Sequence, residues 1–141
     1  MKISIVTTVY NLEKYIKQCL DSIFSSTYKN IEVIVVNDYS NDNSINIVNE
    51  YEDERMVIIN HNENMGAGWA RRHGIEVATG EYVITIDGDD WISEDFIEKL
   101  VENAKTTDAD IVSGGITIVK SDSYHEIKKF LPTISTGFKK F

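Results

Sequence analysis

Residues 81–92 have the sequence EYVITIDGDDWI, in which a short apolar run is followed directly by acidic residues. Residues 82–86 are apolar and rich in β-branched side chains, a pattern that predicts a buried strand. Asp87, Asp89 and Asp90 follow it, and two carboxylates ~4 Å apart repel by about 4 kcal/mol at an effective dielectric of about 20. A divalent cation bound by carboxylate oxygens would offset this repulsion. The alternative is a solvated acidic turn that binds nothing.

Composition indicates a soluble globular protein with one domain. The chain has 141 residues, of which 42% are hydrophobic and 26% charged, and this is too short for two comfortable cores. A net charge of -9 argues against nucleic acid as a partner, because nucleic-acid binding needs a basic surface. No apolar run approaches the ~20 residues of a transmembrane helix, and the start of the chain lacks a signal-peptide pattern. The single Cys19 cannot form an internal disulfide, which suits the cytoplasm.

Apolar patterns alternate between strands and helices along the chain. Helical spacing separates the predicted strands, and Cys19 lies on the first helical stripe, where we expect a packed core thiol. This order predicts an α/β fold with three layers, α/β/α, around a mainly parallel central sheet. We expect residues 1–141 to form a single domain in which residues 120–141 are a peripheral tail. The predicted strands are Ile3–Val9, 31–36, 56–59, 82–86 and 111–119, the last of them interrupted at 113–115.

Three polar clusters follow predicted strands: Tyr10-Asn11, Asn37-Asp38 and residues 87–90. Ligands of parallel α/β sheets bind outside the carboxyl ends of the strands, and all three clusters fall at that edge. Their convergence favours a metal or ligand site over a solvated turn.

Several polar residues allow more than one interpretation. Asp38 could bond a ribose or a base, or it could close a local Asx-turn. Arg71 or Arg72 could pair with a phosphate, although a solvated helix face is the simpler interpretation, especially for Arg72. Asp90 is expected to bond nearby backbone amides. Gly66 precedes this helix in a weakly phosphate-loop-like sequence. The three histidines show no metal-ligand spacing.

Taken together, the motifs of this chain closely resemble those of family 2 glycosyltransferases. The similarity covers about the first two-thirds of the chain, with the motifs in the family's order. The segments that carry it are ISIVTTVYN (3–11), LDSI (20–23), YKNIEVIVVNDYSNDNS (28–44), NMGAGWARRHGI (64–75) and ATGEYVITIDGDDW (78–91).

The resemblance implies a GT-A fold, of which this chain is the Rossmann-like, N-terminal nucleotide-sugar-binding portion. It implies a transferase that uses a nucleotide sugar, expected to be a UDP-sugar, and a divalent metal, Mn²⁺ or Mg²⁺. The sugar would pass with inversion to an acceptor hydroxyl, with the metal acting as a Lewis acid on the diphosphate. For the full-length protein we expect a saccharide or lipid-linked acceptor and a role in surface polysaccharide synthesis. Its expected location is the cytoplasm, including the inner face of the membrane.

The resemblance also assigns nucleotide-binding roles to residues of this chain. Asp38 matches the acidic residue that contacts the base, and Thr8 and Tyr10 lie beside that pocket. Arg71 matches an arginine near the nucleotide.

The DxD motif of the family falls on Asp87, Gly88 and Asp89. Asp87 is expected on the ribose side of the metal site, and Asp89 is expected to coordinate the metal. The chain departs from the family pattern at four positions, with Thr8 in place of Pro, Asn37 in place of Asp, Tyr39 in place of Gly and Arg72 in place of Asn.

The chain contains no residue that matches the catalytic base of the family. An inverting displacement needs a base to deprotonate the acceptor hydroxyl, and the resemblance places that base downstream of Phe141. We therefore expect a truncated donor-binding half with no catalytic residue of its own. The alternatives are a non-catalytic nucleotide-sugar-binding module, a fragment inactive without the missing base, and, ranked lower, a signalling receiver domain.

Overall fold

The computed structural model describes residues 1–120 and 124–128, and it forms two compact units, Met1–Glu94 and Asp95–Phe141. Whether residues 1–141 act as one domain stays a prediction. Within the described part of the chain, none of the helices has the length and apolar character needed to cross a membrane.

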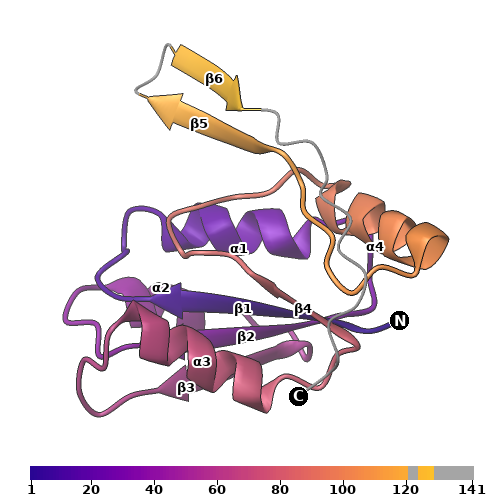
Figure 1. The fold of residues 1–141 in the computed structure, drawn as a ribbon. Helices are drawn as coiled ribbons and strands as arrows, with labels where there is room; N and C mark the ends of the chain where they lie inside the picture. Colours follow the sequence, from indigo (N-terminus) through magenta and orange to yellow (C-terminus); the bar gives the residue numbers. More distant parts are fainter. Residues whose placement is uncertain (121–123, 129–141) are drawn as a thin grey trace. The chain divides into compact units, whose positions relative to one another are not determined.

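The first unit is built on a parallel sheet of four strands in the order β3-β2-β1-β4 (Figure 1). Val9 of β1 is in register with Asn37 of β2, and Val6 is in register with Thr85 of β4. The carboxyl ends of all four strands therefore meet at one edge. Strands β2 and β3 are added on one side of β1, whereas β4 is added on its other side. Parallel α/β sheets bind ligands at the point where the direction of strand addition changes in this way. The strands are β1 (Ile3–Val9), β2 (Ile31–Asn37), β3 (Met56–Asn60) and β4 (Tyr82–Thr85).

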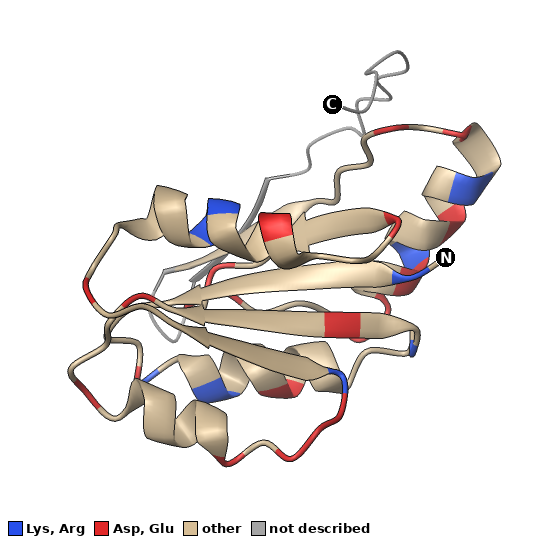
Figure 2. Cartoon of the chain, turned by 90° about the horizontal axis from the view of Figure 1, so that it is seen from below, with Lys and Arg blue, Asp and Glu red and all other residues tan. Residues whose placement is uncertain are grey.

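Helices cover both faces of this sheet, as Figure 2 shows. Right-handed crossovers place α1 (Ile16–Phe24) and α2 (Ser44–Asn49) on one face, where the two helices contact each other. The opposite face is covered by α3 (Ala67–Val77), which packs on β1 and β2. The predicted α/β fold with a parallel sheet is confirmed.

The packing under α3 depends on a glycine. Val6, Ile34 and Val36 point from the sheet toward Ala70, and all four are buried. A Cβ at Gly74 would lie 2.4 Å from Cγ1 of Val6, so only glycine lets the helix approach the sheet this closely. The other face of the sheet packs against α1 and α2 through the alternate residues of β1 and β2, and its buried residues include Ile5, Val33, Val35, Ile16, Leu20, Ile23 and Val48.

The second unit corrects the prediction for residues 111–119. The fifth strand, β5 (Ile116–Lys120), does not join the parallel sheet but pairs antiparallel with β6 (Tyr124–Lys128). Before this strand, the backbone at Gly114 lies against a side chain of α4 (Phe96–Thr107), since a Cβ there would be 2.4 Å from the ring of Phe96. The predicted tail over 120–141 thus contains a strand, and the rest of that tail lies outside the described residues.

At the amino end of the sheet, a hydrogen-bond network centres on the largely buried carboxylate of Glu32. Its carboxylate accepts hydrogen bonds from Lys2 Nζ (2.6 Å), the Thr79 backbone N–H (2.6 Å) and the Ser4 hydroxyl. Burial raises the pKa of Glu32, but these hydrogen bonds outweigh burial and lower the pKa to about 2. The carboxylate therefore ties β1, β2 and the end of α3 together only while it is ionised.

We expect Glu32→Gln to lower the free energy of unfolding at pH 7 by about 1–3 kcal/mol, because charged hydrogen bonds are lost. The folded pKa lies below the ordinary value of 4.5, so the stabilisation is present above pH 4.5 and declines as the pH falls toward 2. The difference between wild type and variant should therefore shrink over that window in urea titrations. Glu76→Gln is the control, because that carboxylate forms an exposed ion pair with Arg72 along one helix. Equal losses in both variants would contradict the prediction.

Candidate functional site

The loops that follow β1 and β2 are joined by hydrogen bonds at the carboxyl edge of the sheet. The backbone N–H of Asp38 donates to the carbonyl of Val9 at 2.8 Å. The Asn11 N–H donates to Ser40 Oγ at 3.1 Å, and the Asn41 N–H donates to Asn11 Oδ1 at 2.8 Å. The two loops are therefore held in one fixed arrangement.

Each of these loops presents an exposed tyrosine. Tyr10 follows β1 and is 46% exposed, and Tyr39 follows β2 and is 48% exposed. Tyr39 has a φ of +65°, in the left-handed region that bulky residues rarely adopt. Thr8, which the family resemblance assigns to the same pocket, is partly buried two residues before Tyr10. Thr8 lies in the last part of β1, and Tyr10 directly follows the strand.

Asp38 is a buried carboxylate that holds the loop before α3. Its side chain is only 3% exposed. Oδ1 accepts hydrogen bonds from His61 Nδ1 (2.7 Å) and Met65 N (2.9 Å), and Oδ2 accepts one from Gly66 N (2.8 Å). Burial raises the pKa of Asp38, but these hydrogen bonds outweigh burial and hold the pKa below its ordinary value. The local Asx-turn interpretation is wrong, because the partners lie 23 to 28 residues away in the sequence.

A second histidine extends this network to the surface of α3. The Nε2 atom of His61 lies 2.9 Å from Nδ1 of His73, and the two rings stack with centroids 5.2 Å apart. Because the ionised Asp38 can only accept, His61 carries its proton on Nδ1 and accepts from His73 when both rings are neutral. The sequence carries no signal for this pair, since twelve residues separate the histidines and only the packing of α3 brings them together.

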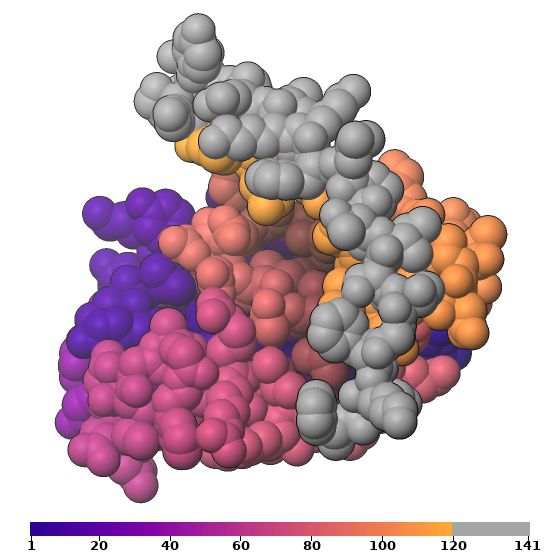
Figure 3. All heavy atoms as spheres, in the orientation of Figure 1, coloured from indigo at the N-terminus to yellow at the C-terminus, as the bar shows by residue number. Residues whose placement is uncertain are grey.

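Gly66 begins α3 with a φ of +88°, which favours glycine. Its N–H points at Asp38 Oδ2 and also lies 3.1 Å from Asn64 Oδ1. The amide that a phosphate-binding loop would offer to its ligand is therefore already used by protein oxygens. Figure 3 shows this loop and α3 in magenta as one continuous part of the surface.

The acidic residues after β4 form a tight turn pressed against the end of β1. The Asp90 N–H donates to the carbonyl of Asp87 at 2.9 Å. Gly88 is buried between them, and a Cβ there would lie 2.8 Å from the Thr8 carbonyl oxygen and 2.9 Å from Leu12 Cδ1. Glycine is thus required by close contact with β1, and the neighbouring carboxylates are left exposed. Figure 2 shows acidic positions in red in the loops at this edge.

The carboxylates of this turn differ in their partners. Asp87 forms an ion pair with Arg71 at 2.6 Å, with side-chain exposures of 49% and 37%. Among the described residues, Asp89 has no hydrogen-bonding or ion-pairing partner, and it is exposed. Burial raises the pKa of Asp90, and the negative charges of Asp89 and Asp87 raise it further. The predicted hydrogen bonds from amides to the Asp90 carboxylate are not formed by the described residues.

Arg71 and Arg72 face different surroundings although they are adjacent in α3. Arg71 reaches the acidic turn, whereas Arg72 pairs with Glu76 one turn along the helix at 2.7 Å. The Arg72 guanidinium also lies over the ring of Trp69, 5.3 Å from its centroid. The helix-face interpretation therefore fits Arg72, and Arg71 is the arginine at the candidate site.

The donor set at the turn suits a cation that is shared with a ligand. Within residues 1–120 and 124–128, the structure has no group of three or more His, Cys, Asp or Glu side chains that could enclose a metal ion. Mg²⁺ and similar ions are commonly held by one or two carboxylates together with phosphate oxygens, so a full protein cage is not required. The Asp89 carboxylate, which has no partner in the described part of the chain, and the mutual repulsion in the turn fit such a cation.

The Cys19 thiol is a core group that packs against the acidic turn after β4. It is fully buried in α1, and its sulfur lies 3.7 Å from the Asp87 carbonyl oxygen. Burial raises the pKa of this thiol to about 12, so it stays protonated. The predicted packed core thiol is confirmed.

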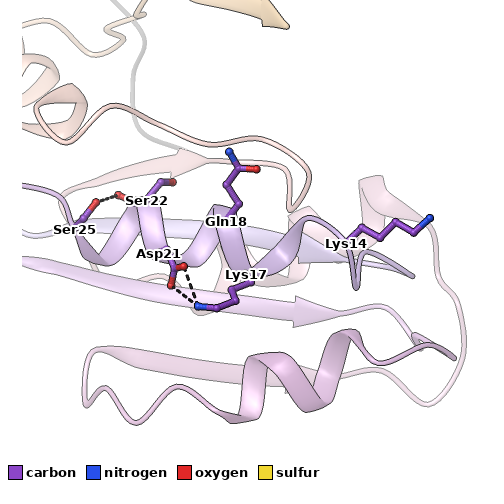
Figure 4. Close-up of a pocket in the computed structure, with 6 residues that line it drawn as sticks. All are labelled: Lys14, Lys17, Gln18, Asp21, Ser22 and Ser25. Atoms are coloured by element: carbon purple, nitrogen blue, oxygen red, sulfur yellow. Dashed lines mark hydrogen bonds and ion pairs between the residues drawn. The ribbon is translucent and has the colours of Figure 1, made fainter. Parts of the chain in front are cut away.

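A shallow depression elsewhere on the first unit contains none of the predicted site residues (Figure 4). It runs along the side of α1 opposite its buried stripe, and the charge of Lys17 is paired with Asp21 at 3.0 Å. Its lining residues are Lys14, Lys17, Gln18, Asp21, Ser22 and Ser25.

Comparison with known proteins points to one family. A family model described as Glycosyl transferase family 2 matches residues 4–140. The glycosyltransferase GlyA of Streptococcus pneumoniae is 44% identical over 115 residues, which are 80% of this chain and 16% of that protein. The chain therefore spans a small part of that relative's length.

Two solved structures share the fold at moderate sequence identity. S. aureus TarS in complex with UDP-GlcNAc matches with a TM-score of 0.75 and 30% identity, covering 78% of this chain and 33% of that one. The mannosyltransferase PcManGT of Pyrobaculum calidifontis, in complex with GDP-Man and Mn²⁺, matches with a TM-score of 0.69 and 26% identity, covering 84% and 35%.

We expect Asp38→Asn to lower the free energy of unfolding by about 1–3 kcal/mol, because an amide cannot accept at both positions that Asp38 uses. The amide hydrogens of Met65 and Gly66 should exchange faster with solvent. Because the folded pKa is depressed, the contribution is present above the unfolded pKa of about 3.9 and is lost as the pH falls below it. Denaturant unfolding and hydrogen exchange would measure both effects. Asp89→Asn removes an exposed charge that has no partner among the described residues and that repels Asp90, so it should leave stability unchanged or slightly higher. A comparable loss there would contradict the assignment.

Proposed function

Because this chain belongs to glycosyl transferase family 2, we propose that it forms the donor-binding part of an inverting glycosyltransferase. The proposed donor is a UDP-sugar, held with the help of a divalent cation, Mn²⁺ or Mg²⁺. Support comes from TarS, which was crystallised with UDP-GlcNAc, and from PcManGT, which was crystallised with GDP-Man and Mn²⁺. A non-catalytic binding module is not favoured, because the named relatives are transferases.

The observation that carries this proposal is the charge arrangement at the acidic turn. Asp89 is an exposed carboxylate without a partner among the described residues, beside an Arg71–Asp87 ion pair at 2.6 Å. A diphosphate with its cation is complementary to this arrangement, since Arg71 offers positive charge to phosphate and Asp89 offers oxygen to the cation. We assign Asp89 and Asp87 to the metal.

The nucleoside is proposed to extend from the turn along the ends of β1 and β2. Thr8 and Tyr10 would line the base pocket, and Asp38 would close it from behind. Asp38 keeps only part of its hydrogen-bonding capacity for a ligand, because three protein donors already occupy it. Arg71 would lie beside the phosphates.

A bound cation would neutralise negative charge on the leaving nucleotide as a Lewis acid. The residues of this chain would hold and orient the donor, with Gly88 keeping the acidic turn close to β1. We propose that the base that deprotonates the acceptor hydroxyl lies outside these 141 residues, in the region of the family that this chain does not span.

The family resemblance supports further proposals about the whole protein. Its acceptor would be a saccharide or a lipid-linked saccharide, and its product part of a surface polysaccharide. We place this activity in the cytoplasm, including the inner face of the membrane, where a lipid-linked acceptor would be reached.

We expect calorimetric titration of UDP into this chain to show binding with Mn²⁺ that is lost with EDTA. Asp89→Asn should weaken the Mn²⁺-dependent binding at least tenfold, because a charged ligand of the cation is removed. Asp21→Asn, on the exposed face of α1, is the matched control and should bind like wild type. Binding that persists in EDTA, or is unchanged in Asp89→Asn, would show that the metal assignment is wrong.

We further expect Arg71→Ala to weaken UDP binding about tenfold while leaving the affinity for Mn²⁺ alone equal or higher, because Asp87 is released from its ion pair. Arg72→Ala changes the adjacent residue of the same helix and should leave UDP binding within twofold of wild type, roughly the scatter expected for an exposed helix pair. Equal effects of the two variants would indicate a general electrostatic contribution instead of a phosphate contact.

A further inference from the structure

Tyr10 and Tyr39 form a pair across the loops after β1 and β2. A hydrogen bond joins the residue directly before each tyrosine, at 2.8 Å, and another joins the residue directly after each, at 3.1 Å. The two tyrosines therefore lie opposite each other on adjacent segments whose backbones are fixed. Their relative placement is set before any ligand arrives.

Both rings are left exposed by the rest of the chain. Tyr10 is 46% exposed and Tyr39 is 48% exposed. The ring pairs that stack within the described residues are Phe24 with Tyr51 and His61 with His73, so neither of the two exposed tyrosines belongs to such a pair. Two large aromatic residues thus lie on neighbouring loops at the edge of the sheet, and neither ring stacks on a ring of the described residues.

Tyr39 also adopts an unfavourable backbone conformation. Its φ of +65° lies in the left-handed region, where glycine or asparagine would fit more easily. The fold buries only about half of Tyr39, so core packing alone does not account for a bulky residue in this conformation. Backbone strain that the fold does not need is characteristic of residues that act on a ligand.

The distance between the two tyrosines and the acidic turn indicates which kind of ligand could reach both. The tyrosines follow β1 and β2. Asp87, which pairs with Arg71, follows β4 on the far side of β1. Two strand spacings, about 10 Å, separate β2 from β4. A nucleoside diphosphate whose phosphates lie at Arg71 would bring its base to the two tyrosines.

We propose that Tyr39 is a specificity-determining residue that, together with Tyr10, stacks on the nucleobase of the donor. This inference rests on the proposed nucleotide-sugar function and adds a residue and a mode of contact to it. Tyr39 contributes through its ring, and Tyr10 supplies the opposing ring from the neighbouring loop. The strained backbone holds the Tyr39 ring at the site.

The test compares two ligands, UDP and inorganic pyrophosphate, by calorimetric titration with Mn²⁺. Tyr39→Gly and Tyr39→Asn both remove the ring and both tolerate a positive φ, so they should keep or raise the melting temperature. We expect each to weaken UDP binding about tenfold, because base–aromatic stacking is lost, and to leave pyrophosphate binding unchanged. Tyr39→Phe retains the ring and should bind UDP like wild type. Trp69→Ala removes a similarly exposed ring from α3 and serves as a control with unchanged binding.

Each outcome decides the proposal. Loss of UDP binding with intact pyrophosphate binding in both ring-deleted variants, at undiminished melting temperature, supports base stacking. Unchanged UDP binding in these variants, or an equal loss for both ligands, overturns the role of Tyr39 while leaving the donor-binding proposal in place. Failure of wild type to bind UDP or GDP with Mn²⁺ overturns the donor-binding proposal and this inference with it.

Discussion

The buried carboxylate of Asp38 is the interaction on which the candidate site depends. A charge that is only 3% exposed must be compensated by hydrogen bonds, and this one takes them from three donors beyond β3. Through Gly66 it sets where α3 begins, and the start of α3 decides that Arg71 faces the acidic turn. The end of β2 is thereby connected to the end of β4 although β1 lies between them. Replacing a single hydrogen-bonding group would loosen several elements together.

The acidic turn shows a second constraint, which is steric. Gly88 lies so close to the carbonyl of Thr8 that any side chain would push the turn away from the sheet. The same contact leaves three carboxylates near one another with one arginine beside them. The turn is thus less balanced electrostatically than the amino end of the sheet, where Glu32 has several donors. Unbalanced charge at the carboxyl edge is expected where a cation or a charged ligand binds.

Parallel topology explains why much of the fold could be predicted. Short β-branched runs separated by helical patterns allow few arrangements, because crossovers are right-handed and the sheet is covered on both faces. The prediction that residues 111–119 form a strand of the parallel sheet was wrong, because an apolar run interrupted by glycines can belong to the main sheet or to a separate hairpin. Only the antiparallel pairing of β5 with β6 distinguishes the two. Apolar pattern alone does not identify a strand's partner.

The sequence by itself determined the strands of the parallel sheet and the polar residues at their ends, because these follow from local pattern and chain order. Local pattern left Arg71 and Arg72 as alternatives, and the family resemblance favoured Arg71. Only the tertiary structure decided which partner each of these residues has. Asp38 binds His61 and the loop before α3, Arg71 pairs with Asp87, and Asp89 has no partner among the residues that the structure describes. These pairings join residues far apart in the chain, and their geometry depends on how closely α3 and β1 pack. That closeness is set by Gly74, whose importance no local pattern reveals, and Gly88 sets how closely the acidic turn approaches β1.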